Sequence, residues 1–153
     1  MKLSRKSDYA LRALVTLTER RGDGPISVRE LAEVNDVPRR FLEQIMLELK
    51  ASGFVRSVPG RVGGFELAMA PELVTMGSVV RLFEDMLAPI ACVSATHYEP
   101  CSQEWRCRFR RVLLDIRNYT ARRMEEATLA SIAAGPPVEA REVFTAYESG
   151  AGI

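Results

Sequence analysis

The chain has 153 residues, of which 47% are hydrophobic and 27% charged. These values are typical of a globular protein of one domain or slightly more, and they exclude a disordered tail protein and a collagen-like repeat. No apolar run approaches the roughly 18–20 residues that span a bilayer, so we expect no membrane partner. The N-terminal segment is charged throughout and lacks a small-residue cleavage site, so we expect a cytoplasmic protein without a secretory signal.

Charge is distributed unevenly along the chain. Residues 1–70 contain 12 Lys or Arg and 9 Asp or Glu, whereas residues 71–153 contain 9 and 11. The mild positive excess of the first half permits a polyanionic partner there.

Apolar spacing predicts a first helix over residues 8–21, with Ser7 as its N-cap and Gly22 at its end. Ser27 and Glu30 then form a capping-box pattern, which predicts a short second helix ending near Asn35 and Asp36.

A third helix is predicted from Pro38, which suits a first turn, to about Ser52. Its apolar stripe consists of Phe41, Leu42, Ile45, Met46 and Leu49. The second predicted helix ends near Asp36 and the third begins at Pro38. Two helices joined by such a short connection have the outline of a helix-turn-helix.

A β-hairpin is predicted directly after these helices. Residues 54–58 are rich in β-formers, residues 59–64 have turn chemistry, and residues 65–68 alternate apolar and polar side chains. Arg56 and Arg61 flank the glycine-rich tip, which suits close approach to phosphates. The predicted fold class is therefore mainly α with a small β-hairpin, a winged helix-turn-helix.

Further helices are predicted over residues 75–87 and 103–127, separated by an irregular loop over 88–103. The second of these would be about 37 Å long and would leave an apolar stripe uncovered, which favours a homodimer formed through this helix. The expected organisation is a winged-helix domain (1–87), a cysteine loop (88–107), a dimerisation region (103–133) and a flexible tail (134–153).

The cysteines Cys92, Cys101 and Cys107 cluster within sixteen residues. An odd number of cysteines in a cytosolic protein argues against a disulfide framework. Their spacing differs from that of a zinc ribbon, although His97 is available as a fourth zinc ligand. Metal binding and a redox switch of free thiols both remain open at this point.

Several motifs together resemble a family of bacterial winged-helix regulators that includes the iron–sulfur regulator IscR, the nitric-oxide sensor NsrR and the iron regulator RirA. They are M-K-L-S-x-K-x-D-Y-A-x-R-A-L at residues 1–14, I-x-x-x-E-L-A-x-x-x-x-V at 26–37, F-L-E-Q-I-M-x-x-L at 41–49, and S-V-x-G-x-x-G-G-F at 57–65. The resemblance covers about residues 1–130 and includes the position of the cysteines. It implies transcriptional regulation by a homodimer on palindromic double-stranded promoter DNA.

The third helix is expected to enter the major groove, with Arg39, Arg40 and Gln44 near base edges. Two arginines at a helix start oppose the helix dipole, which favours a functional role for them. In the wing, relatives have V-R-G where this chain has V-P-G, so Arg61, with Arg56 nearby, is expected to replace the usual arginine. The N-terminal Lys2 and Arg5 are candidates for phosphate contacts.

The resemblance also implies an iron–sulfur cluster on Cys92, Cys101 and Cys107, with [4Fe–4S] favoured over [2Fe–2S]. Three thiolates leave one iron without a cysteine. Glu43, His97 or a small molecule are candidates for that place, and the NsrR-like pattern points to Asp8 of the other subunit. The signal would be nitric oxide, redox state or iron.

Three alternatives stay open: a cluster-free or zinc-binding thiol-switch regulator of the same fold, an iron–sulfur electron carrier, and a winged helix that binds proteins. The sequence contains no nucleophile elbow, dinucleotide fingerprint or Walker loop, so we expect no enzyme.

Overall fold

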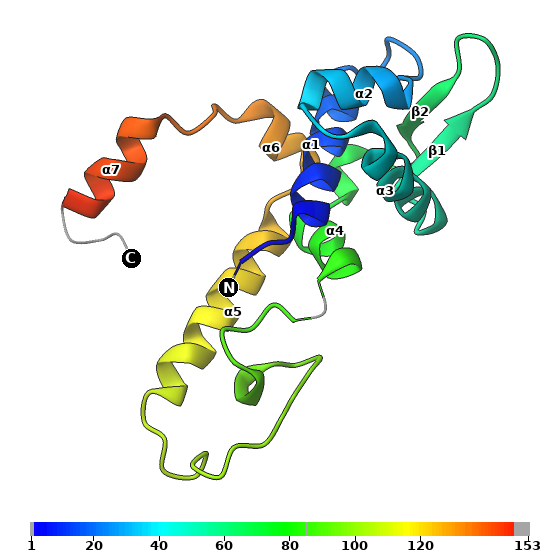
Figure 1. Ribbon diagram of the computed structural model, residues 1–153. Helices are drawn as coiled ribbons and strands as arrows, with labels where there is room; N and C mark the ends of the chain where they lie inside the picture. Colours follow the sequence, from blue (N-terminus) through cyan, green and yellow to red (C-terminus); the bar gives the residue numbers. More distant parts are fainter. Residues whose placement is uncertain (1, 85, 149–153) are drawn as a thin grey trace.

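The computed structural model describes residues 2–84 and 86–148. Its N-terminal half contains three packed helices, α1 (Arg5–Glu19), α2 (Val28–Asn35) and α3 (Arg39–Ala51) (Figure 1). The buried side chains recur at helical spacing, as the sequence predicts, and form one core: Ala10, Ala13, Leu14, Leu31, Leu42, Ile45, Met46 and Leu49.

The helix starts differ from the prediction in two places. Ser4, and not Ser7, caps α1 by accepting a hydrogen bond from the Ser7 amide. Ser7 is fully buried and donates its hydroxyl to Glu84 at 2.5 Å, a contact 77 residues away in the chain. Pro38 occupies the N-cap of α3 rather than its first turn. The Ser27 cap of α2 is confirmed.

Strands β1 (Val55–Val58) and β2 (Gly64–Leu67) form the predicted antiparallel hairpin. The hairpin is fastened to the loop before α2 by two backbone hydrogen bonds between Ile26 and Phe65, of 2.9 and 2.8 Å. Gly64 permits this approach, because a Cβ there would lie 2.3 Å from the Ile26 carbonyl oxygen. The winged helix is therefore confirmed.

After the short η1 (Pro71–Leu73), α4 (Met76–Phe83) packs against α1. This helix ends earlier than the predicted residue 87; residue 85 lies outside the described residues. The backbone of Glu84 is extended, while its carboxylate accepts hydrogen bonds from the Ser4 amide and the Ser7 hydroxyl. These bonds fix the end of α4 to the start of α1.

The long helix α5 (Arg110–Glu126) starts seven residues later than predicted. Residues 101–106 form consecutive turns instead, with amide-to-carbonyl bonds from Glu104 to Cys101 and from Arg106 to Gln103. At about 1.5 Å per residue the helix is about 25 Å long. It projects away from the hairpin and carries the cysteine loop, including η2 (Ala91–Val93), at its far end (Figure 1).

The chain then returns to the N-terminal half through α6 (Leu129–Ala134), whose Leu129 is fully buried in the main core. Hydrogen bonds from Met76 to Ala127 and from Leu129 to Val74 close this return.

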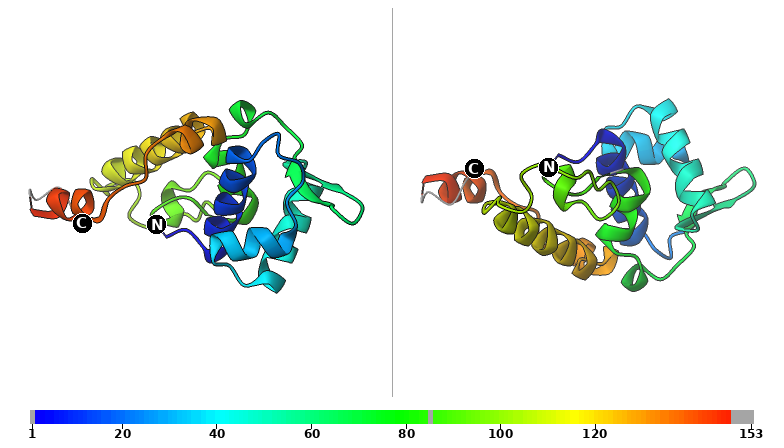
Figure 2. Two further views of the ribbon diagram at one scale, coloured as in Figure 1. Left: turned by 90° about the horizontal axis from the view of Figure 1, so that it is seen from above. Right: turned by 90° about the horizontal axis from the view of Figure 1, so that it is seen from below.

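The segment expected as a flexible tail (134–153) contains a helix, α7 (Ala140–Glu148). It lies at the opposite end of the molecule from the hairpin (Figure 2). The last part of the predicted tail, residues 149–153, lies outside the described residues. In the part of the chain that is described, no helix has the length and apolar character that crossing a membrane requires.

Candidate DNA interface and cysteine pocket

The start of α3 presents an exposed basic surface. Arg39, Arg40 and Gln44 are all exposed, whereas the opposite side of the helix is buried in the core. Arg39 Nε forms an ion pair with Glu43 Oε1 at 2.9 Å. The side chain of Arg40 has no ion pair or hydrogen bond within the described residues, and the first turn contains no acidic residue. The positive charge of Arg40 at this helix start thus remains available to a polyanion.

The two wing arginines differ in their surroundings. Arg56 on β1 pairs with Glu66 on β2 at 2.9 Å, which partly neutralises it. Arg61 is exposed at the hairpin tip, and its side chain has no partner in the described part of the chain. Of the N-terminal candidates, Lys2 precedes α1 and Arg5 is its first residue; both are exposed.

The three cysteines lie between α4 and α5, and all three are free thiols. Cys92 is buried in η2, Cys101 is exposed, and Cys107 is half-buried just before α5. They line one pocket of about 520 Å³ that is mostly apolar. Across residues 2–84 and 86–148, no three Cys, His, Asp or Glu side chains are grouped closely enough to hold a metal ion. The ligands of a cluster bind different iron atoms, so they need not be as close together as the ligands of one zinc ion.

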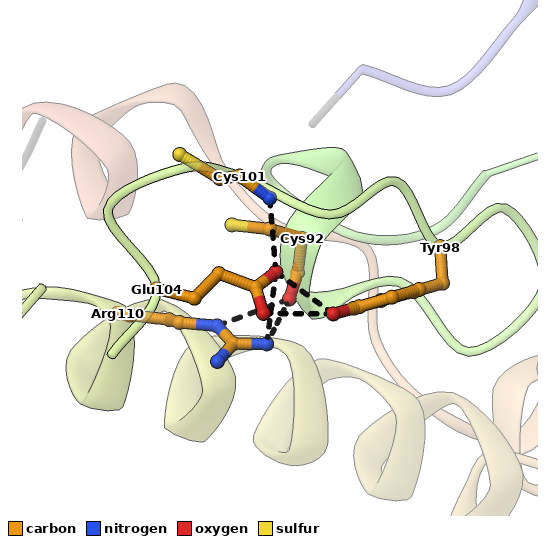
Figure 3. A network of polar contacts seen from close by, with 5 residues as sticks. All are labelled: Cys92, Tyr98, Cys101, Glu104 and Arg110. Atoms are coloured by element: carbon orange, nitrogen blue, oxygen red, sulfur yellow. Dashed lines mark hydrogen bonds and ion pairs between the residues drawn. The ribbon is translucent and has the colours of Figure 1, made fainter.

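A network of polar contacts holds this loop together (Figure 3). The Glu104 carboxylate accepts hydrogen bonds from the Tyr98 hydroxyl at 2.7 and 2.9 Å and from the Cys101 amide at 3.2 Å. Arg110 lies 3.4 Å from the same carboxylate and donates two hydrogen bonds, of 3.1 and 2.7 Å, to the Cys92 carbonyl. Glu104 and Arg110 therefore connect the backbone at Cys92 and at Cys101 to the start of α5.

These contacts shift two pKa values. The hydrogen bond from Tyr98 lowers the pKa of Glu104; burial opposes the shift, while the Cys101 amide and Arg110 add to it. The same bond, together with burial, raises the pKa of Tyr98. The carboxylate is therefore held in its charged form beside the cysteines.

None of the three candidates for a fourth ligand lines the cysteine pocket. Asp8 is on α1 and forms hydrogen bonds of 3.1 and 2.7 Å with Arg12. Glu43 is paired with Arg39 on α3. His97 is exposed in the cysteine loop, with its ring Nδ1 3.2 Å from Thr96, and is not among the residues that line the cysteine pocket. Within one chain, Asp8 and the cysteines do not form one site.

On its outward face α5 carries a stripe of exposed apolar side chains. Its inner face packs Leu113 and Leu114 against the cysteine loop, and Met124 is buried nearer the N-terminal half. The exposed large apolar residues recur every three or four positions: the N-cap Phe109, then Val112, Ile116 and Tyr119. The apolar spacing predicts a single dimerisation stripe on this helix. In the structure these residues lie on two faces, one packed against the cysteine loop and one exposed.

The sequence does not predict Tyr98, Glu104 and Arg110 as site residues, nor the role of Glu84. Spacing carries no signal for them, because their roles depend on hydrogen bonds formed only when the loop folds. The position of Glu104 between two cysteines is the one hint that was available.

Comparisons with known proteins agree with this architecture. A family model described as Rrf2, iron-dependent transcriptional regulator, matches residues 3–135. An HTH-type transcriptional regulator of Rhodobacter capsulatus, described as rrf2-like, is 38% identical over 120 residues, 74% of this chain and 80% of the relative. The regulator NsrR of Halalkalibacterium halodurans is 31% identical over 132 residues, 86% and 90% of the two chains. The solved structure of CymR, the global cysteine regulator of B. subtilis, has a TM-score of 0.77 at 27% identity and covers 90% of this chain and 99% of that one. The chain therefore belongs to the Rrf2 family of transcriptional regulators.

Proposed function

We propose that this DNA-binding regulator acts as a homodimer whose operator affinity is controlled by an iron–sulfur cluster on Cys92, Cys101 and Cys107. The observation that carries the proposal is that all three cysteines line one pocket, although they belong to separate parts of the loop. When bound, such a cluster supplies iron that reacts with nitric oxide or oxygen. The presence of the cluster also depends on the supply of iron.

In this proposal DNA is read by α3. Arg40 is unpaired within the described residues and projects from the first turn, where a recognition helix meets base edges. Arg39 exchanges its contact with Glu43 for a contact with DNA, and Arg61 brings positive charge to the neighbouring backbone from the wing tip. One bidentate arginine–guanine pair contributes about 1–3 kcal/mol of discrimination.

The dimer is formed through the outward face of α5. Four large apolar side chains on one stripe of this helix are between 46% and 67% exposed. Covering them with the same stripe of a second copy removes apolar surface from water and sets the separation of two recognition helices. Half-sites on one face of a duplex lie about 34–36 Å apart.

The cysteine pocket is mechanically connected to the DNA-binding half. The loop begins just after α4, whose end is fixed to α1 through Glu84, Ser4 and Ser7. It ends at α5, which forms an ion pair with α4 through Glu125 and Arg81. Ordering of the loop by its cysteines therefore acts on α4, which packs against α1, and on α5, which packs against α4. Asp8 of the second subunit is the proposed fourth ligand, which would join α1 of one chain to the loop of the other.

A second candidate is a thiol switch without a cluster. The contrast between an exposed Cys101 and a buried Cys92 favours selective oxidation at Cys101. In that case DNA binding would respond to oxidants in metal-free protein. Among the three single cysteine-to-serine variants, only Cys101→Ser would abolish the response.

The test is DNA affinity by fluorescence anisotropy with a palindromic operator obtained by selection. Protein purified without oxygen is compared before and after exposure to nitric oxide. We expect a change of about 5- to 150-fold, the usual range of coupling between sites. Each of Cys92→Ser, Cys101→Ser and Cys107→Ser should remove the change, whereas the exposed loop control Ser102→Ala should retain it. An unchanged response in all three cysteine variants would disprove control through this pocket.

A further inference from the structure

A second cavity, of about 550 Å³, lies between the cysteine loop and α5. Four arginines line it: Arg108, Arg110, Arg111 and Arg117. The one acidic residue in its lining is Glu104. Arg111 and Arg117 line this cavity and not the cysteine pocket, whereas Cys101 lines only the pocket, so the two adjoin without coinciding.

Most of this positive charge is unpaired. Arg110 is occupied by Glu104 and by the Cys92 carbonyl. In the described part of the chain, the side chains of Arg108, Arg111 and Arg117 form no ion pair or hydrogen bond. The Nε of Arg117 is also buried and has no acceptor. A buried donor without an acceptor is costly, so a ligand that supplies acceptors here would be bound favourably.

We infer that this cavity binds a small molecule with at least two negatively charged groups, phosphates or carboxylates. Guanidinium groups pair with both through two parallel hydrogen bonds, and three unpaired arginines exceed what one singly charged anion neutralises. The volume lies within the usual range for small-molecule sites, about 300–1,000 Å³. DNA is a poor fit, because α3 and the hairpin lie at the other end of the molecule (Figure 1).

The cavity would give the regulator a second input. Five residues line both this cavity and the cysteine pocket: Cys92, Glu104, Cys107, Arg108 and Arg110. A bound anion would compete with Glu104 for Arg110 and so alter the contacts that hold the Cys92 carbonyl. The inference goes beyond the proposed function and does not require a cluster.

Isothermal titration of the full-length protein tests the inference, with pyrophosphate and succinate as probes at constant ionic strength and sodium chloride as the blank. We expect saturable binding of one probe molecule per chain, and the tighter of the two probes identifies the charged group. Arg117→Gln should weaken binding by about 10- to 100-fold, as expected for a lost charge-assisted hydrogen bond. The matched control is Arg122→Gln on the same helix, because Arg122 lies over Tyr119 and does not line the cavity.

Absence of saturable binding of either probe would overturn the inference, and so would equal affinity in Arg117→Gln and Arg122→Gln. If Arg117→Gln does not fold, Arg111→Gln serves for the same comparison. Binding should also persist in Cys101→Ser, which cannot hold a three-cysteine cluster but leaves the cavity lining intact. Its result therefore separates failure of this inference from failure of the proposed function.

Discussion

Replacing Gly64 with alanine should detach the wing from the rest of the DNA-binding half. The added Cβ would lie 2.3 Å from the oxygen and 2.4 Å from the carbon of the Ile26 carbonyl, and 2.7 Å from the Ser27 nitrogen. These are backbone atoms that cannot rotate away, so the strand and the loop must separate. The two hydrogen bonds between Ile26 and Phe65 would then break.

The expected cost follows from those two bonds. At about 0.5–1.5 kcal/mol each, their loss lowers the free energy of unfolding by about 1–3 kcal/mol. Urea denaturation followed by circular dichroism measures this directly. Gly135→Ala is the matched control, because its nearest atoms lie at 3.4 and 3.5 Å, and it should change stability by less than about 0.5 kcal/mol.

The same variant also tests the role of the wing. Affinity for operator DNA should fall. If Arg61 loses its contact with one phosphate, the slope of log affinity against log salt concentration should become shallower by about one. Equal stability of Gly64→Ala and Gly135→Ala would refute the packing argument. Lower stability with unchanged DNA affinity would refute a role of the wing in DNA binding.

Three further changes test other parts of the molecule. Ile116→Glu should give monomers in light scattering, whereas Asp115→Gln, also exposed on α5, should stay dimeric. A monomeric wild-type protein would refute dimerisation through α5. Arg40→Gln should weaken operator binding by about 1–3 kcal/mol, and Arg123→Gln at the end of α5 should not; equal affinities would mean that α3 is not the reading helix. Glu84→Gln should destabilise the protein at pH 7, and its difference from wild type in urea unfolding should shrink below about pH 4.5; a difference independent of pH would exclude the carboxylate's charge as the cause.

The pH dependence of the last variant has a definite sign. Burial raises the pKa of Glu84, but hydrogen bonds from Ser7 and Ser4 outweigh it and hold the pKa below the ordinary 4.5. A lowered pKa in the folded protein means that the ionised carboxylate stabilises the fold, fully so at pH values above the ordinary pKa of 4.5. The stabilisation is lost as the pH falls through the folded pKa.

The sequence predicts the winged helix well because its elements depend on local signals. The capping box at Ser27, the core stripe of α3 and the glycines of the wing all act within a few residues. Those signals are sufficient where neighbours in the chain are also neighbours in space.

The prediction is less accurate where distant segments decide the structure. Ser7 has the chemistry of an N-cap, but its hydroxyl is required by Glu84, so Ser4 takes that role. The pattern from residue 103 is helical in composition, yet Glu104 bonds to Tyr98 and to the Cys101 amide, and the helix begins only at Arg110. The cysteine spacing likewise reveals nothing of the arginines beside the pocket.

The iron and acid-labile sulfide content of protein purified without oxygen directly tests whether the three cysteines hold a cluster. A [4Fe–4S] cluster on each chain predicts about four iron and four sulfide atoms per chain, together with visible absorption that Cys92→Ser, Cys101→Ser or Cys107→Ser abolishes. Protein that contains zinc alone, or cysteine variants that keep the same iron and sulfide content, would contradict it.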